Sequence, residues 1–188
     1  MDFLLQMAFP FDILHAELIR TALESEKQRS AAKSEFHEVF TGLNLEHIED
    51  GLIQKAFLHT NAETKLETIG FRVGRSLVEK VARDSPKLVT ELEIVKFICK
   101  EFWVSVFGKQ VDNLRTNHQG VYVVQDSRFT TLRTFPEGTQ FIKDSAYFLA
   151  LPCGLIRGAL SALNIRAIVT PTVESLPATK FHIQIQQK

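Results

Sequence analysis

The most informative hydrophobic pattern of the chain runs from Leu92 to Asp126 and changes its period half-way. The first half repeats apolar residues every three or four positions, which predicts a helix. Its apolar arc is wider than the roughly 100° stripe of a surface helix, so we expect it to contact other elements on several sides. Gly108 predicts its C-terminal end. Residues 121–126 then alternate between apolar and mixed positions, which predicts a strand.

Weaker helical patterns precede this block. One helix is expected from about Phe11 toward Arg29, a second over 44–58 and a third over 66–81. Thr60 stands three residues before Glu63, which is typical of a capping box that opens the third helix. The polar segment 24–38 would either extend the first helix or form a linker, and its composition favours neither.

The C-terminal half of the chain predicts strands around one more helical region. That region covers 141–163 and is expected to be one helix broken at Pro152, or two helices. Residues 128–135 are expected to pair back on the preceding strand as a hairpin. Strands joined by short turns, with helices before and between them, predict an α+β fold with helices packed on one face of a small antiparallel sheet. The expected strands are 111–116, 121–125, 128–135, 165–173 and 180–186.

Composition narrows the class of protein. A length of 188 residues predicts a single domain over 1–188. The 22 basic and 22 acidic side chains give no net charge, which argues against binding nucleic acid or an anionic bilayer over the whole surface. Two cysteines, Cys99 and Cys153, form neither a metal-binding spacing nor a disulfide framework. The apolar N-terminus carries Asp2 and lacks a basic region, so we expect neither a signal peptide nor a membrane span.

Candidate chemistry is sparse. The densest polar run, Arg115–Gly120, includes His118 but no acid or nucleophile at a catalytic spacing, and its Asn and Gly are typical of a loop. The chain has no nucleophile elbow, no phosphate-binding glycine loop and no zinc-binding helix motif. We therefore expect no enzyme activity, no catalytic residues, no cofactor and no metal site.

Two pairs of glycines interrupt helical patterns. Gly70 and Gly74 are four residues apart, as are Gly154 and Gly158. Each glycine lowers helix stability by about 1 kcal/mol relative to alanine, so a compensating close approach of another helix is expected. That helix would belong either to a partner or to the same domain.

A family resemblance rests on three stretches of sequence. They are ETIGFRVGRSLVE, KFICKEFWVSVFGKQVDNLRTNHQGVYVVQD and CGLIRGALSAL. They resemble the small subunits of the TRAPP (transport protein particle) complexes, in particular the subunit-six group. The resemblance covers Leu66 to Lys188 and includes ILHAELI near the N-terminus. It fails between Glu24 and Thr60, where this chain is longer, so the single domain is expected to carry a non-matching helical or linker segment at about 24–60.

The resemblance implies a function and partners. It implies a non-catalytic scaffold subunit of a TRAPP complex, which supports nucleotide exchange on a Rab/Ypt-type GTPase and vesicle tethering in endoplasmic reticulum-to-Golgi and Golgi transport. The implied partners are TRAPP subunit 3 and other TRAPP subunits, with a homodimer as an alternative. The implied location is the cytoplasmic side of the cis-Golgi and the endoplasmic reticulum–Golgi interface, with membrane association only through the complex. A small-molecule-binding module or enzyme of the wider fold family is the rival, which a roomy pocket with convergent polar groups would favour.

The resemblance also implies a helix-to-helix interface with subunit 3. Helix one and the 66–81 helix each have an apolar side that would suit it, and glycines would let the partner helix approach. The expected interface residues are Leu14, Leu18, Ile19, Ile69, Gly70, Val73, Gly74 and Leu77.

Three further side-chain expectations follow. Subunit 3 carries a palmitoylated cysteine between its second and third conserved helices, but the corresponding link here, Arg83–Glu91, has no cysteine, so no acyl chain is expected. Cys99 should be buried and inert, whereas Cys153 is expected to begin a helix whose dipole would lower its pKa. Arg157 is expected to pair with a carboxylate such as Asp112 or Glu101.

Overall fold

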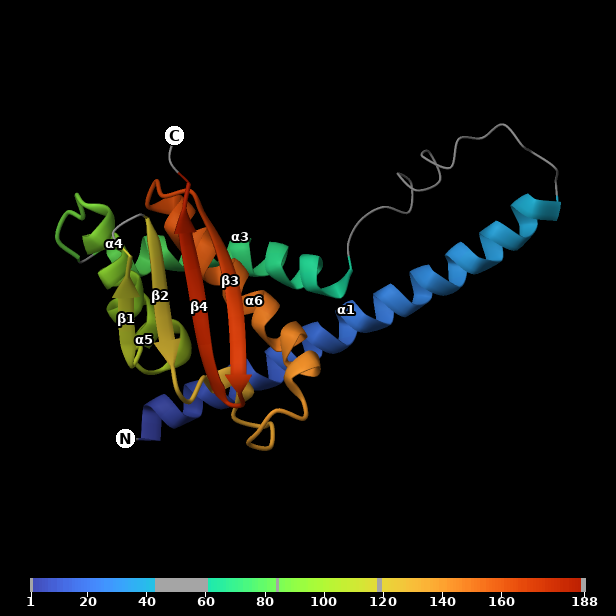
Figure 1. Ribbon diagram of the computed structural model, residues 1–188, viewed down its shortest axis with the longest axis horizontal. Helices are drawn as coiled ribbons and strands as arrows, with labels where there is room; N and C mark the ends of the chain where they lie inside the picture. Colours follow the sequence, from blue (N-terminus) through green and yellow to red (C-terminus); the bar gives the residue numbers. More distant parts are fainter. Residues whose placement is uncertain (1, 43–60, 84, 118–119, 187–188) are drawn as a thin grey trace.

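The computed structural model describes residues 2–42, 61–83, 85–117 and 120–186. In Figure 1 a sheet lies in front of two crossing helices, and a long N-terminal helix extends away from this body. The helical elements are α1 (Asp2–Gly42), α3 (Ala62–Ala82), α4 (Glu91–Phe97), the π-helical turn η1 (Ile98–Phe102), α5 (Trp103–Phe107), the 3-10 turn η2 (Thr130–Leu132) and α6 (Ile142–Ala162). The strands are β1 (Asn113–Thr116), β2 (Val121–Asp126), β3 (Ala167–Ser175) and β4 (Ala178–Ile185).

The sheet is antiparallel throughout, in the order β1-β2-β4-β3. Val124 lies opposite Phe181 and Tyr122 lies opposite Ile183, and all four side chains are buried under the helices. On the other face Val123 lies opposite His182, and both are half-buried. The period-two alternation of the strands therefore puts one face of the sheet on the helices, which confirms the predicted α+β fold.

The predicted central helix is present as α4, η1 and α5, which follow one another without a break. Thr90 caps its start through a capping box with Glu93. Within η1 the wider turn leaves the carbonyl of Cys99 free to accept a hydrogen bond from the Val111 amide at 3.3 Å. Gly108 ends the helix with φ +78°, as predicted. The wide apolar arc is also confirmed, because this helix contributes Trp103 to a buried aromatic cluster with Phe107, Phe129 and Phe181.

Helices α3 and α6 pack along a seam of four glycines. A Cβ on Gly70 or Gly74 would overlap the backbone of Leu151 or Leu155 in α6. A Cβ on Gly154 or Gly158 would likewise overlap the backbone of Glu67 or Phe71 in α3. The two glycine pairs predicted from the sequence therefore face each other, and the helix that approaches closely belongs to the same chain.

Two predictions for the C-terminal half are wrong. Residues 128–135 form no strand but turn through η2, because the carboxylate of Asp126 accepts a hydrogen bond from the Arg128 amide and that of Asp112 from the Ser127 amide. The strands that pair with β2 are β1 and β4 instead. Pro152 does not break α6, which runs unbroken and is buried on both sides of the proline.

Helix α6 is long and apolar enough to resemble a membrane span. The sequence analysis expected no apolar run of that length. The helix would suffice to cross a bilayer by length and composition alone. Most of its side chains are buried among α3 and the sheet, and it is the central core helix of this fold.

The polar segment after residue 24 continues α1 rather than forming a linker. Residues 11–26, which we call the near part of α1, pack on the body through the buried side chains of His15, Ile19 and Ala22. Glu26 accepts a hydrogen bond from the Ala62 amide of α3 at 3.1 Å, and Ser25 accepts one from the Lys65 ammonium at 2.6 Å. Beyond this point α1 leaves the body (Figure 1). The predicted 44–58 helix and Thr60 lie outside the described residues, and Asn61 caps α3.

Candidate functional site

The expected interface residues of α1 divide between surface and core. Leu14 is 59% exposed and its neighbour Ile13 is 56% exposed. Leu18 is half-buried, and Ile19 is buried against the body. Ile19 therefore holds α1 in place, while Ile13 and Leu14 leave an apolar pair in solvent.

The α3 part of the expected set divides in the same way. Ile69 is 36% exposed and Val73 is 42% exposed, whereas Leu77 is half-buried. Gly70 and Gly74 are buried, and the backbone of α6 occupies the space in front of them. The expected reason for these glycines is therefore corrected: they accommodate α6 and offer no surface to a partner helix.

Polar side chains border the apolar pair of α1. Arg20 is exposed and forms ion pairs with Glu17 and Glu24 on successive turns. An apolar centre with a charged rim is the usual anatomy of a protein–protein interface. We call the exposed residues Ile13 and Leu14 of α1 with Ile69 and Val73 of α3 the helical face.

The ion pair expected for Arg157 is present with a different partner. Its Nε lies 2.9 Å from a carboxylate oxygen of Glu67 in α3, not near Asp112 or Glu101 as expected. The guanidinium also lies over the ring of Phe71, 4.7 Å from the ring centre. Because α3 crosses α6 at the glycine seam, Arg157 meets residues of α3 that are distant in sequence, and sequence spacing did not reveal this pair.

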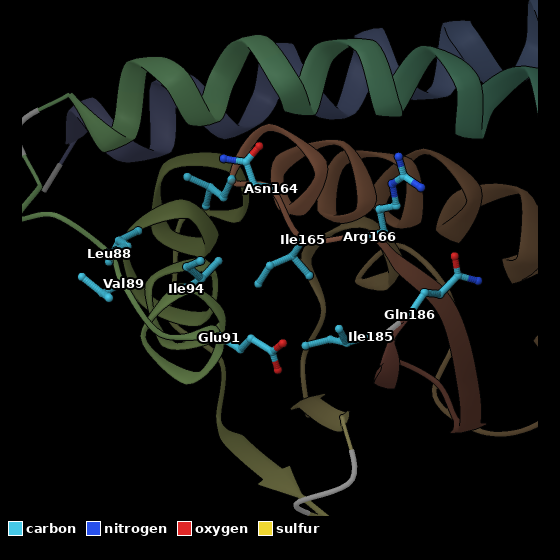
Figure 2. Close-up of a pocket in the computed structure, with 10 residues that line it drawn as sticks. Leu88, Val89, Glu91, Ile94, Asn164, Ile165, Arg166, Ile185 and Gln186 are labelled. Atoms are coloured by element: carbon cyan, nitrogen blue, oxygen red, sulfur yellow. The ribbon is translucent and has the colours of Figure 1, made fainter. Parts of the chain in front are cut away.

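An open cleft of about 490 Å³ lies between the start of α4, the link between α6 and β3, and the C-terminal end of β4. Figure 2 shows Ile165 at its centre, Ile94 on the α4 side and Ile185 on the sheet side. In the same view the Arg166 guanidinium and the Gln186 amide point away from Ile165. The polar groups do not converge on one point, so the cleft lacks the arrangement that would favour a small-molecule site.

Comparison with known proteins identifies the family. A family model described as "Transport protein particle (TRAPP) component" matches residues 11–186. The chain belongs to the TRAPP component family. It is 53% identical over 124 residues to trafficking protein particle complex subunit 6B of Homo sapiens, covering 66% of this chain and 78% of that protein. It is 48% identical over 120 residues to subunit 6A of Homo sapiens, covering 64% and 76% respectively.

A solved member of the TRAPP family shares the fold. It is trafficking protein particle complex subunit 3 from Naegleria fowleri, covalently bound to palmitic acid. The TM-score is 0.55 at 18% identity, and the match covers 86% of this chain and 97% of that one. The family resemblance and the fold class predicted from the sequence are thereby confirmed.

The two thiols of this TRAPP-family chain are both buried. Burial raises the pKa of Cys99 to about 12. Cys153 lies in the middle of α6, not at a helix start as expected, so no N-terminal dipole acts on it. Burial, and to a smaller extent the nearby carboxylate of Glu67, raises its pKa. Neither cysteine has the exposed, ionised character of a reactive thiol.

The histidines of this chain form no recognisable site within the described residues. His118 lies outside them, His182 lies on the outer face of the sheet, and His15 is buried under α1. The described residues contain no cluster of His, Cys, Asp or Glu able to hold a metal ion.

Proposed function

We propose that the chain is a non-catalytic subunit of a TRAPP complex. Its identity of about half to trafficking protein particle complex subunits 6A and 6B carries this proposal. By the same resemblance, the assembled complex promotes nucleotide exchange on a Rab/Ypt-type GTPase and tethers vesicles between the endoplasmic reticulum and the Golgi. The chain would act on the cytoplasmic side of these membranes and reach them through the complex.

The helical face is proposed as the contact with TRAPP subunit 3. It offers an exposed apolar pair on α1 and another on α3, two helices that adjoin through Ser25, Glu26, Ala62 and Lys65. We propose that each apolar pair is covered by a helix of the partner. A second copy of this chain is the alternative occupant, and size measurement of the purified protein distinguishes the two.

A charge at the helical face tests the contact. Val73→Glu should leave the fold intact, since substitutions on exposed positions change stability by only about ±0.5 kcal/mol. If Val73 is buried by subunit 3, the charge should weaken binding at least tenfold, which corresponds to roughly 1.4 kcal/mol. Leu14→Glu should act in the same direction. Titration calorimetry with purified subunit 3 measures both effects.

A matched control variant is available in α5. Val104 is 39% exposed, against 42% for Val73, and also lies on a helix. Val104→Glu should bind subunit 3 with wild-type affinity. Equal affinities for the Val73 and Val104 variants would show that the helical face is not the interface.

The non-catalytic role has a separate test. The purified chain should not accelerate release of labelled nucleotide from a Rab/Ypt-type GTPase, because no site for displacing a nucleotide is recognisable in the sequence. A TRAPP assembly reconstituted with the chain serves as the positive control. Clear acceleration by the chain alone would contradict the scaffold role.

A further inference from the structure

His15 occupies an unusual position on the side of α1 that packs against α6. Its side chain is only 2% exposed and lies between the rings of Phe11 and Phe148, whose centres are each 5.8 Å from its own. Its Nε2 is buried and has no hydrogen-bond partner among the described residues. The contact between α1 and α6 therefore contains a titratable ring whose buried Nε2 would carry a proton with no hydrogen-bond acceptor.

The attachment of α1 is separable from the rest of the core. Between residues 11 and 31, where α1 side chains are described, only His15, Ile19 and Ala22 are buried. Two adjacent residues, Ser25 and Glu26, form hydrogen bonds to α3 at the far end of this stretch. The seam of α3 with α6 and the sheet behind it do not depend on these contacts. Elements with few buried contacts open at a lower free energy than the whole fold.

We propose that protonation of His15 releases the near part of α1 from α6 and so regulates the helical face. A charged imidazole at this position would be held among aromatic rings without a partner, so it favours the released state. Release moves Ile13 and Leu14 away from the body that carries Ile69 and Val73. The effect on partner binding rests on the proposed function of the helical face, whereas the release of α1 does not.

The pH range follows from the titration of His15. Burial lowers its pKa from 6.5 to about 4 in the docked state. Docking is therefore strongest above pH 6.5, weakens as the pH falls, and changes no further below about 4. With these two values, the docking equilibrium constant falls about 4-fold at pH 6 and about 30-fold at pH 5.

Other charged groups around the contact do not reproduce this effect. On α1, burial raises the pKa of Asp12, while the nearby Arg133 lowers it. Protonation of Asp12 therefore strengthens docking, which is opposite in sign to the effect of protonating His15. On α6, Lys143 and Asp144 are exposed one turn before Phe148. On α3, Lys65 is hydrogen-bonded to Ser25 of α1. Among the residues whose side chains the structure describes, His15 is the one whose lowered pKa weakens docking between pH 6.5 and 5.

Hydrogen exchange of the full chain without a partner tests the release. Between pH 7.5 and 5, after correction for intrinsic exchange rates, protection of the amides of residues 11–26 should fall roughly 30-fold. Amides of α3 and α6 should keep their protection. In His15→Phe, whose ring fits among Phe11 and Phe148 without titrating, protection of α1 should not fall with pH and should rise if Asp12 acts alone. His182→Phe is the matched control and should behave as wild type.

Three results would overturn or redirect the inference. Protection of α1 that does not fall in the wild type overturns it, as does an equal fall in His15→Phe with α3 and α6 still protected. If the His15→Phe protein loses amide protection in α3 and α6 as well, the variant is unfolded and NMR titration of the wild-type His15 ring replaces it. A measured pKa near 6.5 would contradict the buried contact and overturn the inference.

Binding to TRAPP subunit 3 at the same pH values separates the two proposals. Affinity that falls together with α1 protection supports both. Protection that falls while affinity stays constant supports the release of α1 and shows that α1 is not part of the interface. Affinity that falls while α1 stays protected overturns the release as the cause.

Discussion

The α-carbon of Gly74 in α3 lies against the backbone carbonyl oxygen of Leu155 in α6, and a side chain has no room between them. Gly74→Ala should therefore lower the free energy of unfolding. Overpacking typically costs about 1–3 kcal/mol and here involves rigid backbone, whereas alanine returns only about 1 kcal/mol of helix propensity. Urea denaturation followed by circular dichroism measures the difference. Because the seam is internal, Gly74→Leu should melt early and lose its partner only through unfolding.

Ser76→Ala is the control for this prediction. It also gains helix propensity, by about half as much as a glycine replacement, on an exposed position of the same helix. Its stability should therefore equal or slightly exceed that of wild type. A Gly74→Ala protein as stable as Ser76→Ala would show that α3 and α6 do not approach as closely as described.

The glycine seam between α3 and α6 was predicted only in part from the sequence. The spacing of Gly70 and Gly74 predicted close approach of a helix, since small residues remove the obstacle to it. The spacing could not say which helix approaches, because local sequence holds no information on pairing. The second glycine pair, Gly154 and Gly158, was the available signal for an internal seam. Two helices of one chain that each carry glycines four residues apart can pack closely against each other.

The elements predicted with the wrong structure share a physical cause. The alternating residues of 128–135 suit a strand, but Asp126 and Asp112 bind the amides at its start and Phe129 inserts into the aromatic cluster. Pro152 disfavours a helix locally, yet burial of residues 151–156 around it outweighs the lost hydrogen bond. Tertiary contacts decide both cases, and the burial of His15 was invisible for the same reason.

Both cysteines should be unreactive in the native protein. A chromogenic disulfide reagent should modify neither thiol until the protein opens, because burial raises the pKa of Cys99 to about 12 and also raises that of Cys153. Ser76→Cys, which places a thiol on the exposed side of α3, should react at once. Intact mass from eukaryotic cells should show no hydroxylamine-sensitive acyl group. A palmitoyl-sized adduct on either cysteine would contradict this prediction.

A buried carboxylate links the central helix to the sheet. Asp126 at the end of β2 is fully buried. It accepts hydrogen bonds from Trp103 Nε1 at 3.2 Å and from the Arg128 amide at 3.0 Å, and its other contact is the Lys109 ammonium at 2.6 Å. Lys109 is the one full positive charge in this set. Its removal would leave a buried carboxylate with two neutral donors.

Lys109→Met should therefore destabilise the fold more than an ordinary surface substitution. Breaking a buried pair costs about 3–5 kcal/mol, and we expect about 3 kcal/mol here because Lys109 retains some contact with solvent. Lys180→Met is the control, since its partner Glu174 is exposed and such pairs contribute about 1 kcal/mol or less. Adding Asp126→Asn to Lys109→Met should recover at least half of the loss, because the amide oxygen still accepts from Trp103 without carrying a charge. Additive losses in urea denaturation would show that Lys109 and Asp126 do not stabilise each other.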